Sequence, residues 1–195
     1  MPGRVDAMHW LGPTPEDEMR AVIVYESMFG NTQTIAEAVA LGLSIHGIEV
    51  VRCEVGQATP GSLEDHDLLV VGAPTHALSL SRTTSRASAA EQATAPLVST
   101  GEGIREWLER LPAGDGRHVA TFDTHVDKRI PGSASKAARK RLRRLGYHPV
   151  APAESFFVSD MQGPLVDGEV ERARAWGVRL ATAIGATGRA QPSNP

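Results

Sequence analysis

The sequence predicts an α/β protein, with a parallel sheet covered by helices on both faces in three layers. Short apolar runs rich in β-branched residues alternate with longer segments whose apolar residues recur at helical spacing. The alternation produces five strand-and-helix units between residues 20 and 184. Since right-handed crossovers join parallel strands, five such units predict a doubly wound five-stranded parallel sheet.

The predicted strands differ in how continuously apolar they are. Residues 21–25 form an unbroken apolar run, and 67–73 continue as one after Asp67, which is typical of strands buried on both faces. Residues 49–55 alternate in part and are expected nearer a sheet edge. The fourth strand is predicted at 118–122, and the fifth at 155–158, with 150–151 as its expected start.

The predicted helices each have one apolar stripe. They begin after Asn31, near Ile104, after Gly132 and near Glu169, and the last one is expected to end at Ile184. Trp107 and Trp176 lie on or beside these stripes and are expected in the core or an interface. The helices and strands leave one long connection, 74–100, which is interpreted as functional or mobile. Within it, Arg82 and Arg86 would close over a ligand or, in the simpler interpretation, remain solvated.

The chain is expected to hold one domain between two poorly structured ends. Residues 1–19 are rich in Pro and charge without periodicity and form a predicted leader, residues 20–184 form the domain, and residues 185–195 are a predicted disordered tail. No apolar stretch approaches the roughly 20 residues of a membrane span, and the first residues lack a secretory signal. A lone Cys53 also fits a reducing compartment, so we expect a cytoplasmic protein.

The charge balance argues against polyanion binding as a global property. Twenty Lys and Arg face 23 Asp and Glu, for a net charge of −3, so neither nucleic acid nor a membrane is an expected partner. The strongest local charge feature is the basic helix 136–144, whose bases are interpreted as a solvated face. This helix could dock an acidic electron-transfer partner or add to a homodimer interface.

Ligands of open parallel sheets bind beyond the carboxyl ends of the strands. After the first strand, Ser27 to Thr32 join a buried strand to a helix N-terminus, where backbone N–H groups and the helix dipole suit a phosphate. The alternative is that Asn31 or Thr32 only caps the helix while Gly30 permits the turn.

Two segments together support the ligand interpretation. Glu26-Ser-Met-Phe-Gly-Asn-Thr32, with Gly72-Ala-Pro-Thr-His76 after the third strand, resembles the flavodoxin-like family of FMN-binding proteins. The resemblance covers about residues 20–184 and implies a flavodoxin-like fold with strand order 2-1-3-4-5.

The resemblance also implies a cofactor site. Phosphate would be held by Ser27, Gly30, Asn31 and Thr32, while Met28 and Phe29 replace hydroxyl or small residues and remove one hydroxyl contact. The isoalloxazine ring would lie between two further segments, with His76 and His125 in place of the usual stacking aromatics. These two segments are Pro74, Thr75 and His76 after the third strand, and Asp123, Thr124 and His125 after the fourth.

The implied function is FMN-dependent electron transfer or oxidoreduction with an unidentified redox partner. The alternative is an interaction module of the same fold that has lost tight flavin binding and contacts a partner through the basic helix and the long loop. No metal-ligand cluster, P-loop, dinucleotide fingerprint or hydrolase elbow is present in the sequence. The third strand ends in Gly-Ala-Pro rather than the Asp that a phosphoacceptor receiver domain requires.

Overall fold

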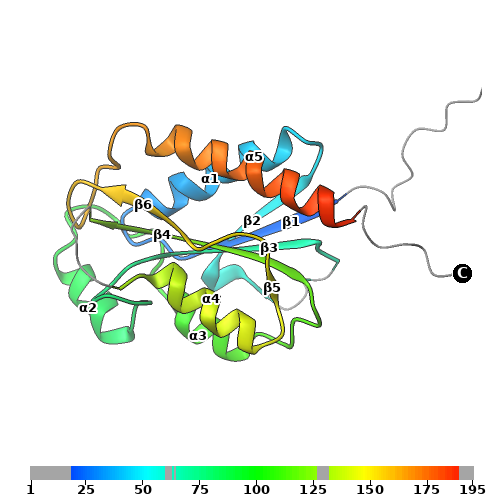
Figure 1. The fold of residues 1–195 in the computed structure, drawn as a ribbon. Coiled ribbons are helices and arrows are strands. Elements are labelled where there is room, and N and C mark those ends of the chain that lie inside the picture. Colours follow the sequence, from blue (N-terminus) through cyan, green and yellow to red (C-terminus); the bar gives the residue numbers. More distant parts are fainter. Residues whose placement is uncertain (1–18, 60–62, 64, 127–131, 189–195) are drawn as a thin grey trace, which may run out of the picture.

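The computed structural model describes residues 19–59, 63, 65–126 and 132–188 and shows a sheet between two helical layers (Figure 1). The predicted leader therefore lies almost wholly outside the described residues. Helices α1 (Asn31–Ser44) and α5 (Glu169–Gly188) cover one face of the sheet. Helices α3 (Ile104–Arg110) and α4 (Ala134–Arg144) cover the other. The predicted three-layer α/β/α architecture is confirmed.

The strands are parallel and follow the order β2-β1-β3-β4-β5, which confirms the expected 2-1-3-4-5 topology. The predicted fifth strand is divided into two short strands, β5 and β6. Both pair with β4, β5 near its start and β6 near its end. The bounds are β1 (Arg20–Tyr25), β2 (Glu49–Glu54), β3 (Leu68–Pro74), β4 (His118–Val126), β5 (His148–Pro149) and β6 (Glu154–Val158).

The sheet separates two apolar clusters because successive strand residues point to opposite faces. Ile23 packs toward α1 and α5, whereas Val22 and Val24 pack toward α3 and α4. Both predicted core tryptophans are buried, Trp107 on α3 and Trp176 on α5. Trp176 also meets Phe122 and Phe156 edge to face, with ring centroids 6.0 and 6.1 Å away.

Three expectations about element bounds are corrected. The connection 74–100 is not one long loop, because α2 (Thr83–Glu91) forms within it and lies near the carboxyl end of the sheet (Figure 1). Strand β4 runs to Val126, since it pairs with β6 as far as that residue, so Asp123, Thr124 and His125 are strand rather than loop residues. Helix α5 continues four residues past Ile184, so the expected tail cannot begin at Gly185.

Two side-chain expectations also fail. Val170, at the start of the apolar stripe expected on the last helix, is exposed, because it lies in the first turn of α5 beyond the apolar cluster. Arg86 was expected to be solvated but is buried, because α2 directs it toward α3.

Candidate functional site

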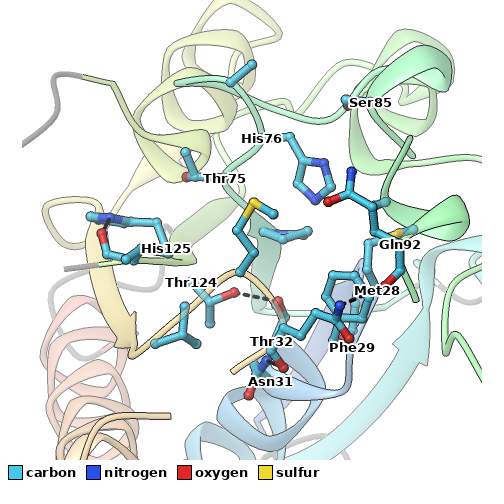
Figure 2. Close-up of a pocket in the computed structure, with 18 of the residues that line it drawn as sticks. Met28, Phe29, Asn31, Thr32, Thr75, His76, Ser85, Gln92, Thr124 and His125 are labelled. Atoms are coloured by element: carbon cyan, nitrogen blue, oxygen red, sulfur yellow. Dashed lines mark hydrogen bonds between the residues drawn. The ribbon is translucent and has the colours of Figure 1, made fainter. Parts of the chain in front are cut away.

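One cavity of about 280 Å³ opens where β1, β3, β4 and β6 end. Its walls come from the segment after β1, the end of β3 with α2, and the ends of β4 and β6. Figure 2 shows His76, Ser85 and Gln92 on one side of it and Thr75, Thr124 and His125 on the other. Among the described residues, none that lines it is Asp, Glu, Lys or Arg. These residues would therefore hold an anionic ligand mainly through N–H and hydroxyl dipoles.

The segment between β1 and α1 turns sharply at Gly30. Its φ of 86° lies in the left-handed region, and a Cβ there would meet no atom within 4 Å. Glycine is thus required by backbone conformation rather than by crowding. Gly30 is also the N-cap of α1 but supplies no side-chain cap.

The first N–H groups of α1 remain available for a ligand. Ser27 Oγ accepts from Gln33 N–H at 3.3 Å, which satisfies one donor of the first turn. The N–H groups of Phe29 through Thr32 have no acceptor among the described residues. Together with the positive end of the helix dipole, these donors form an anion-binding cradle.

Two hydroxyl groups join this cradle to β4. Thr32 Oγ1 and Thr124 Oγ1 lie 2.8 Å apart and both side chains are buried (Figure 2). A hydroxyl carries one proton, so a pair uses only one of its two protons on itself. The other proton is available to a ligand oxygen in the cavity.

Val98 and Ser99, in the segment before α3, hydrogen-bond to the backbone that precedes the cradle. Val98 N–H donates to Met28 O at 3.1 Å and Ser99 N–H to Ser27 O at 2.8 Å. Ser27 N–H in turn donates to Ser99 Oγ, whose own proton goes to Glu54. These bonds fix the backbone of Ser27 and Met28, so the cradle is formed before any ligand binds.

The Thr75 hydroxyl is occupied by structural bonds. It donates to Asp123 Oδ2 at 2.9 Å and accepts from Ala134 N–H at 2.8 Å. The same carboxylate oxygen accepts from Ser133 Oγ and from Ser135 N–H. Asp123 is fully buried and does not line the cavity, so its side chain anchors the start of α4 to β3.

His76 lines the cavity from a strained turn. Its backbone pairs with Ser79 in both directions, and the two residues between them, Ala77 and Leu78, have φ of 44° and 73°. Such angles are costly for residues with a Cβ and cluster at functional sites. Burial, with a smaller contribution from the charge of Arg86, lowers the pKa of His76 below its usual 6.5. The imidazole is therefore neutral at neutral pH and can both donate and accept a hydrogen bond.

His125 is held by its own neighbours. Its Nδ1 lies 2.9 Å from Val126 O, and its ring meets Phe157 nearly at right angles, with centroids 5.1 Å apart. The ring lines the cavity, but these contacts set its orientation.

Helix α2 is anchored by a buried ionic cluster. Arg86 Nη1 donates to Ser81 Oγ at 2.9 Å and to Glu106 Oε2 at 3.1 Å. Glu26, directly before the cradle, accepts from Ile104 N–H, while its Oε1 has no partner within the described part of the chain. Burial raises the pKa of Glu26, against the opposing effects of Ser81, Ile104 and Arg86.

The cavity wall contains residues that the sequence analysis did not find. Gln162 connects three parts of the site: its Nε2 donates to Gln92 O at 2.8 Å, its Oε1 accepts from Thr94, and its backbone O accepts from Asn31 Nδ2. An alanine-rich run in 83–91 was the available signal for α2. The lining residues not predicted are Ala77, Ser85, Ser88, Ala89, Gln92, Val126, Val158, Met161 and Gln162.

Most of the predicted site residues meet at this cavity. Gly30 and Asp123 are the two that do not line it: Gly30 shapes the turn and Asp123 lies beneath the surface. The predicted residues that line it are Ser27, Met28, Phe29, Asn31, Thr32, Pro74, Thr75, His76, Thr124 and His125.

The chain has a flavodoxin-like fold, and comparison with known proteins agrees. Residues 23–92 match the family model of flavodoxin. The chain is 31% identical over 74 residues to a putative diflavin flavoprotein A 4 of Synechocystis sp. and 39% identical over 72 residues to a putative diflavin flavoprotein A 5 of Nostoc sp.. These matches cover 36% and 34% of this chain and 12% of each relative. The chain thus corresponds to a small part of those proteins.

Solved structures show the same fold over most of the chain. A flavodoxin from the domain Archaea superposes with a TM-score of 0.61 at 17% identity, covering 86% of this chain and 99% of that one. Rubredoxin oxygen:oxidoreductase of Desulfovibrio gigas superposes with a TM-score of 0.58 at 18% identity, covering 90% of this chain and 39% of that one. The predicted likeness to the flavodoxin-like family is confirmed.

The described residues offer neither a metal site nor a membrane-spanning helix. No group of three or more His, Cys, Asp or Glu among them could hold a metal ion. None of the helices in that part of the chain is long and apolar enough to cross a bilayer.

Proposed function

We propose that this chain binds FMN in the cavity and acts in electron transfer or flavin-dependent oxidoreduction. The observation that carries the proposal is the row of N–H groups from Phe29 to Thr32, which have no acceptor in the described part of the chain, beside the Thr32–Thr124 hydroxyl pair. A phosphate monoester is the ligand group that such a neutral, donor-rich cradle suits. The family likeness, in a family whose members bind flavin, supports the same assignment.

The remaining lining suits a flat ring with a polar edge. Met28, Pro74 and Met161 supply apolar surface, and His76 and Gln92 supply polar atoms on the side of α2. FMN, when bound, supplies the redox chemistry. The protein binds and orients it, and the neutral His76 imidazole offers a hydrogen bond without adding charge beside the ring.

The absence of a stacking pair sets an expectation for affinity. Among the described lining residues, Phe29 on the cradle side is the one aromatic carbocycle, and the ring of His125 is oriented by Phe157 and Val126. Phosphate capture therefore contributes a larger share of the binding free energy than ring stacking does. The alternative module without flavin is not favoured by the family likeness, and the open cradle argues against it.

A reductive titration tests the function. Purified protein, loaded with FMN and freed of excess by gel filtration, is expected to show a bound-flavin absorption spectrum that dithionite bleaches reversibly. The midpoint potential of this bound flavin should differ from that of free FMN, because the site contacts the ring. Loss of all flavin on gel filtration, or an unshifted potential, would overturn the proposal.

We also propose a cytoplasmic location, because Cys53 is the one cysteine of the sequence and no internal disulfide can form. We further propose that the protein exchanges electrons with a redox partner and that it forms a homodimer. Sedimentation at increasing protein concentration tests the dimer, with a monomer at all concentrations as the contradicting result.

A further inference from the structure

A groove lies between α4 and the connection from β5 to β6. Its volume is about 680 Å³. The inner side of α4 is occupied by Ala134, Ala138 and Leu142, which are buried in the core. The groove is lined by five bases and two small apolar residues, Lys136, Arg139, Lys140, Arg143, Arg144, Pro152 and Ala153.

The five bases of the groove are not neutralised within the described part of the chain. No Asp or Glu described there lies within ion-pair distance of any of them. The one base of the helix that does pair is Arg141, whose Nη1 lies 3.5 Å from Glu109 and which does not line the groove. Arg139 Nε is buried without an acceptor among the described residues.

This arrangement is costly for an isolated helix. Lys136 and Lys140 are four residues apart, as are Lys140 and Arg144, and like charges at this spacing destabilise a helix by roughly 0.2–0.5 kcal/mol per pair. The helix dipole favours cations in the last turn, which accounts for Arg143 and Arg144. It disfavours Lys136, which is in the first turn. A merely solvated face would intersperse both signs of charge.

The shape and surroundings of the groove distinguish between anionic partners. Nucleic acid is disfavoured, because the groove has no aromatic side chain on which a base could stack and the whole chain carries a net charge of −3. A lipid surface is flat, whereas these bases line an open groove bordered by Pro152 and Ala153. A protein segment with several carboxylates fits both the shape and the charge.

We propose that the α4 groove is a docking surface for an acidic segment of a partner protein. The carboxylates of that segment pair with Lys136, Lys140 and Arg143, and its backbone lies along Pro152 and Ala153. The surface is separate from the flavin cavity, with which it shares no lining residue. The proposal therefore does not depend on flavin binding.

The experiment measures binding of fluorescein-labelled decaglutamate by anisotropy at low ionic strength. The test variant is Lys140→Glu/Arg143→Glu, and the control is Arg174→Glu/Arg179→Glu, which makes the same change in charge at exposed positions of α5. We expect the test variant to weaken binding about tenfold or more, and the control to weaken it less than about twofold. Carbodiimide cross-linking should join the peptide to Lys136 or Lys140.

Three outcomes would overturn the proposal. They are equal weakening in both variants, cross-links that map away from α4, and tighter binding of labelled decathymidylate than of decaglutamate. FMN affinity, measured on the same variants, is expected to stay unchanged. Failure of the docking proposal can thus be told apart from failure of the flavin proposal.

Discussion

The hydroxyl oxygens of Thr32 and Thr124 lie 2.8 Å apart although 92 residues separate them in the chain. The contact joins the first turn of α1 to the carboxyl end of β4 at the floor of the cavity. A ligand phosphate on the α1 side and a ring near β4 are therefore positioned by one rigid unit.

Thr32→Ala is expected to weaken FMN binding by about 1–3 kcal/mol, because it removes a hydroxyl at the cradle and leaves Thr124 without its partner. Riboflavin, which lacks the phosphate, should lose much less affinity. Fluorescence titration with both flavins measures the difference. Thr32→Ser should retain most of the affinity, and Thr182→Ala, at an exposed hydroxyl of α5, serves as the control. Equal losses for both flavins would show that Thr32 does not act through phosphate.

Gly42→Ala is expected to destabilise the fold by about 1–3 kcal/mol or more, because α1 and α5 approach closely at this residue. A Cβ at Gly42 would lie 2.1 Å from Arg174 O and 2.9 Å from Gly177 Cα, which are backbone atoms and cannot turn away. Urea unfolding measures the loss. Gly101→Ala, where a Cβ meets nothing within 4 Å, is the control and should change stability little. Similar stabilities of the two variants would contradict the close packing.

Glu26→Gln is expected to change how stability depends on pH. The pKa of Glu26 is higher in the folded protein than in the unfolded chain, where it is near 4.5. Stability from this group is therefore present below that value and declines as pH rises through the raised pKa. Since glutamine does not titrate, the difference in unfolding free energy between wild type and variant should shift in favour of the variant as pH rises.

The pH test compares urea midpoints of the two proteins from about pH 4.5 to neutrality. The buried histidines act in the opposite sense, because burial lowers the pKa of His76 and of His66, but both are present in the two proteins and cancel in the difference. A difference that does not vary with pH would show that Glu26 titrates normally.

Gln162→Ala is expected to loosen the wall of the cavity, because Gln162 bonds to Gln92 O and to Thr94 beside α2. Two lost hydrogen bonds at about 1 kcal/mol each predict FMN dissociation that is several-fold to about thirtyfold faster. Stopped-flow dissociation measures the rate, and amide exchange at residues 92–99 should also quicken. Gln57→Ala, at an exposed glutamine, should change neither quantity. An unchanged dissociation rate in Gln162→Ala would mean that this wall does not retain the ligand.

The strands and the main helices could be predicted because their apolar patterns are strong. Residues 21–25 and 68–73 are buried in the sheet as predicted, whereas Asp67, the expected first residue of the third strand, is exposed and precedes β3. Helix α2 was missed because its inward side chains are small or polar, with Arg86 as its buried residue, so no apolar stripe marks it. The burial of Arg86 depends on Glu106, 20 residues away, and local pattern does not show such a pairing.

The two loop motifs predicted most of the cavity because parallel strands end at the same edge. The walls from α2 and the segment after β6 could not be predicted, since residues such as Gln92 and Gln162 belong to no motif and meet only through the tertiary fold. Asp123 is a residue that the motif wrongly assigned to the cavity. It directly follows the predicted strand, where ligand contacts are expected, but β4 extends past it and its carboxylate is buried.

The most direct test of the account is a titration of flavin-free protein with FMN and, separately, with riboflavin. We expect saturable FMN binding and much weaker riboflavin binding, because the cradle from Phe29 to Thr32 suits a phosphate and the described cavity lining has no aromatic pair to hold the ring. Equal affinity for the two flavins, or no binding of either, would contradict it.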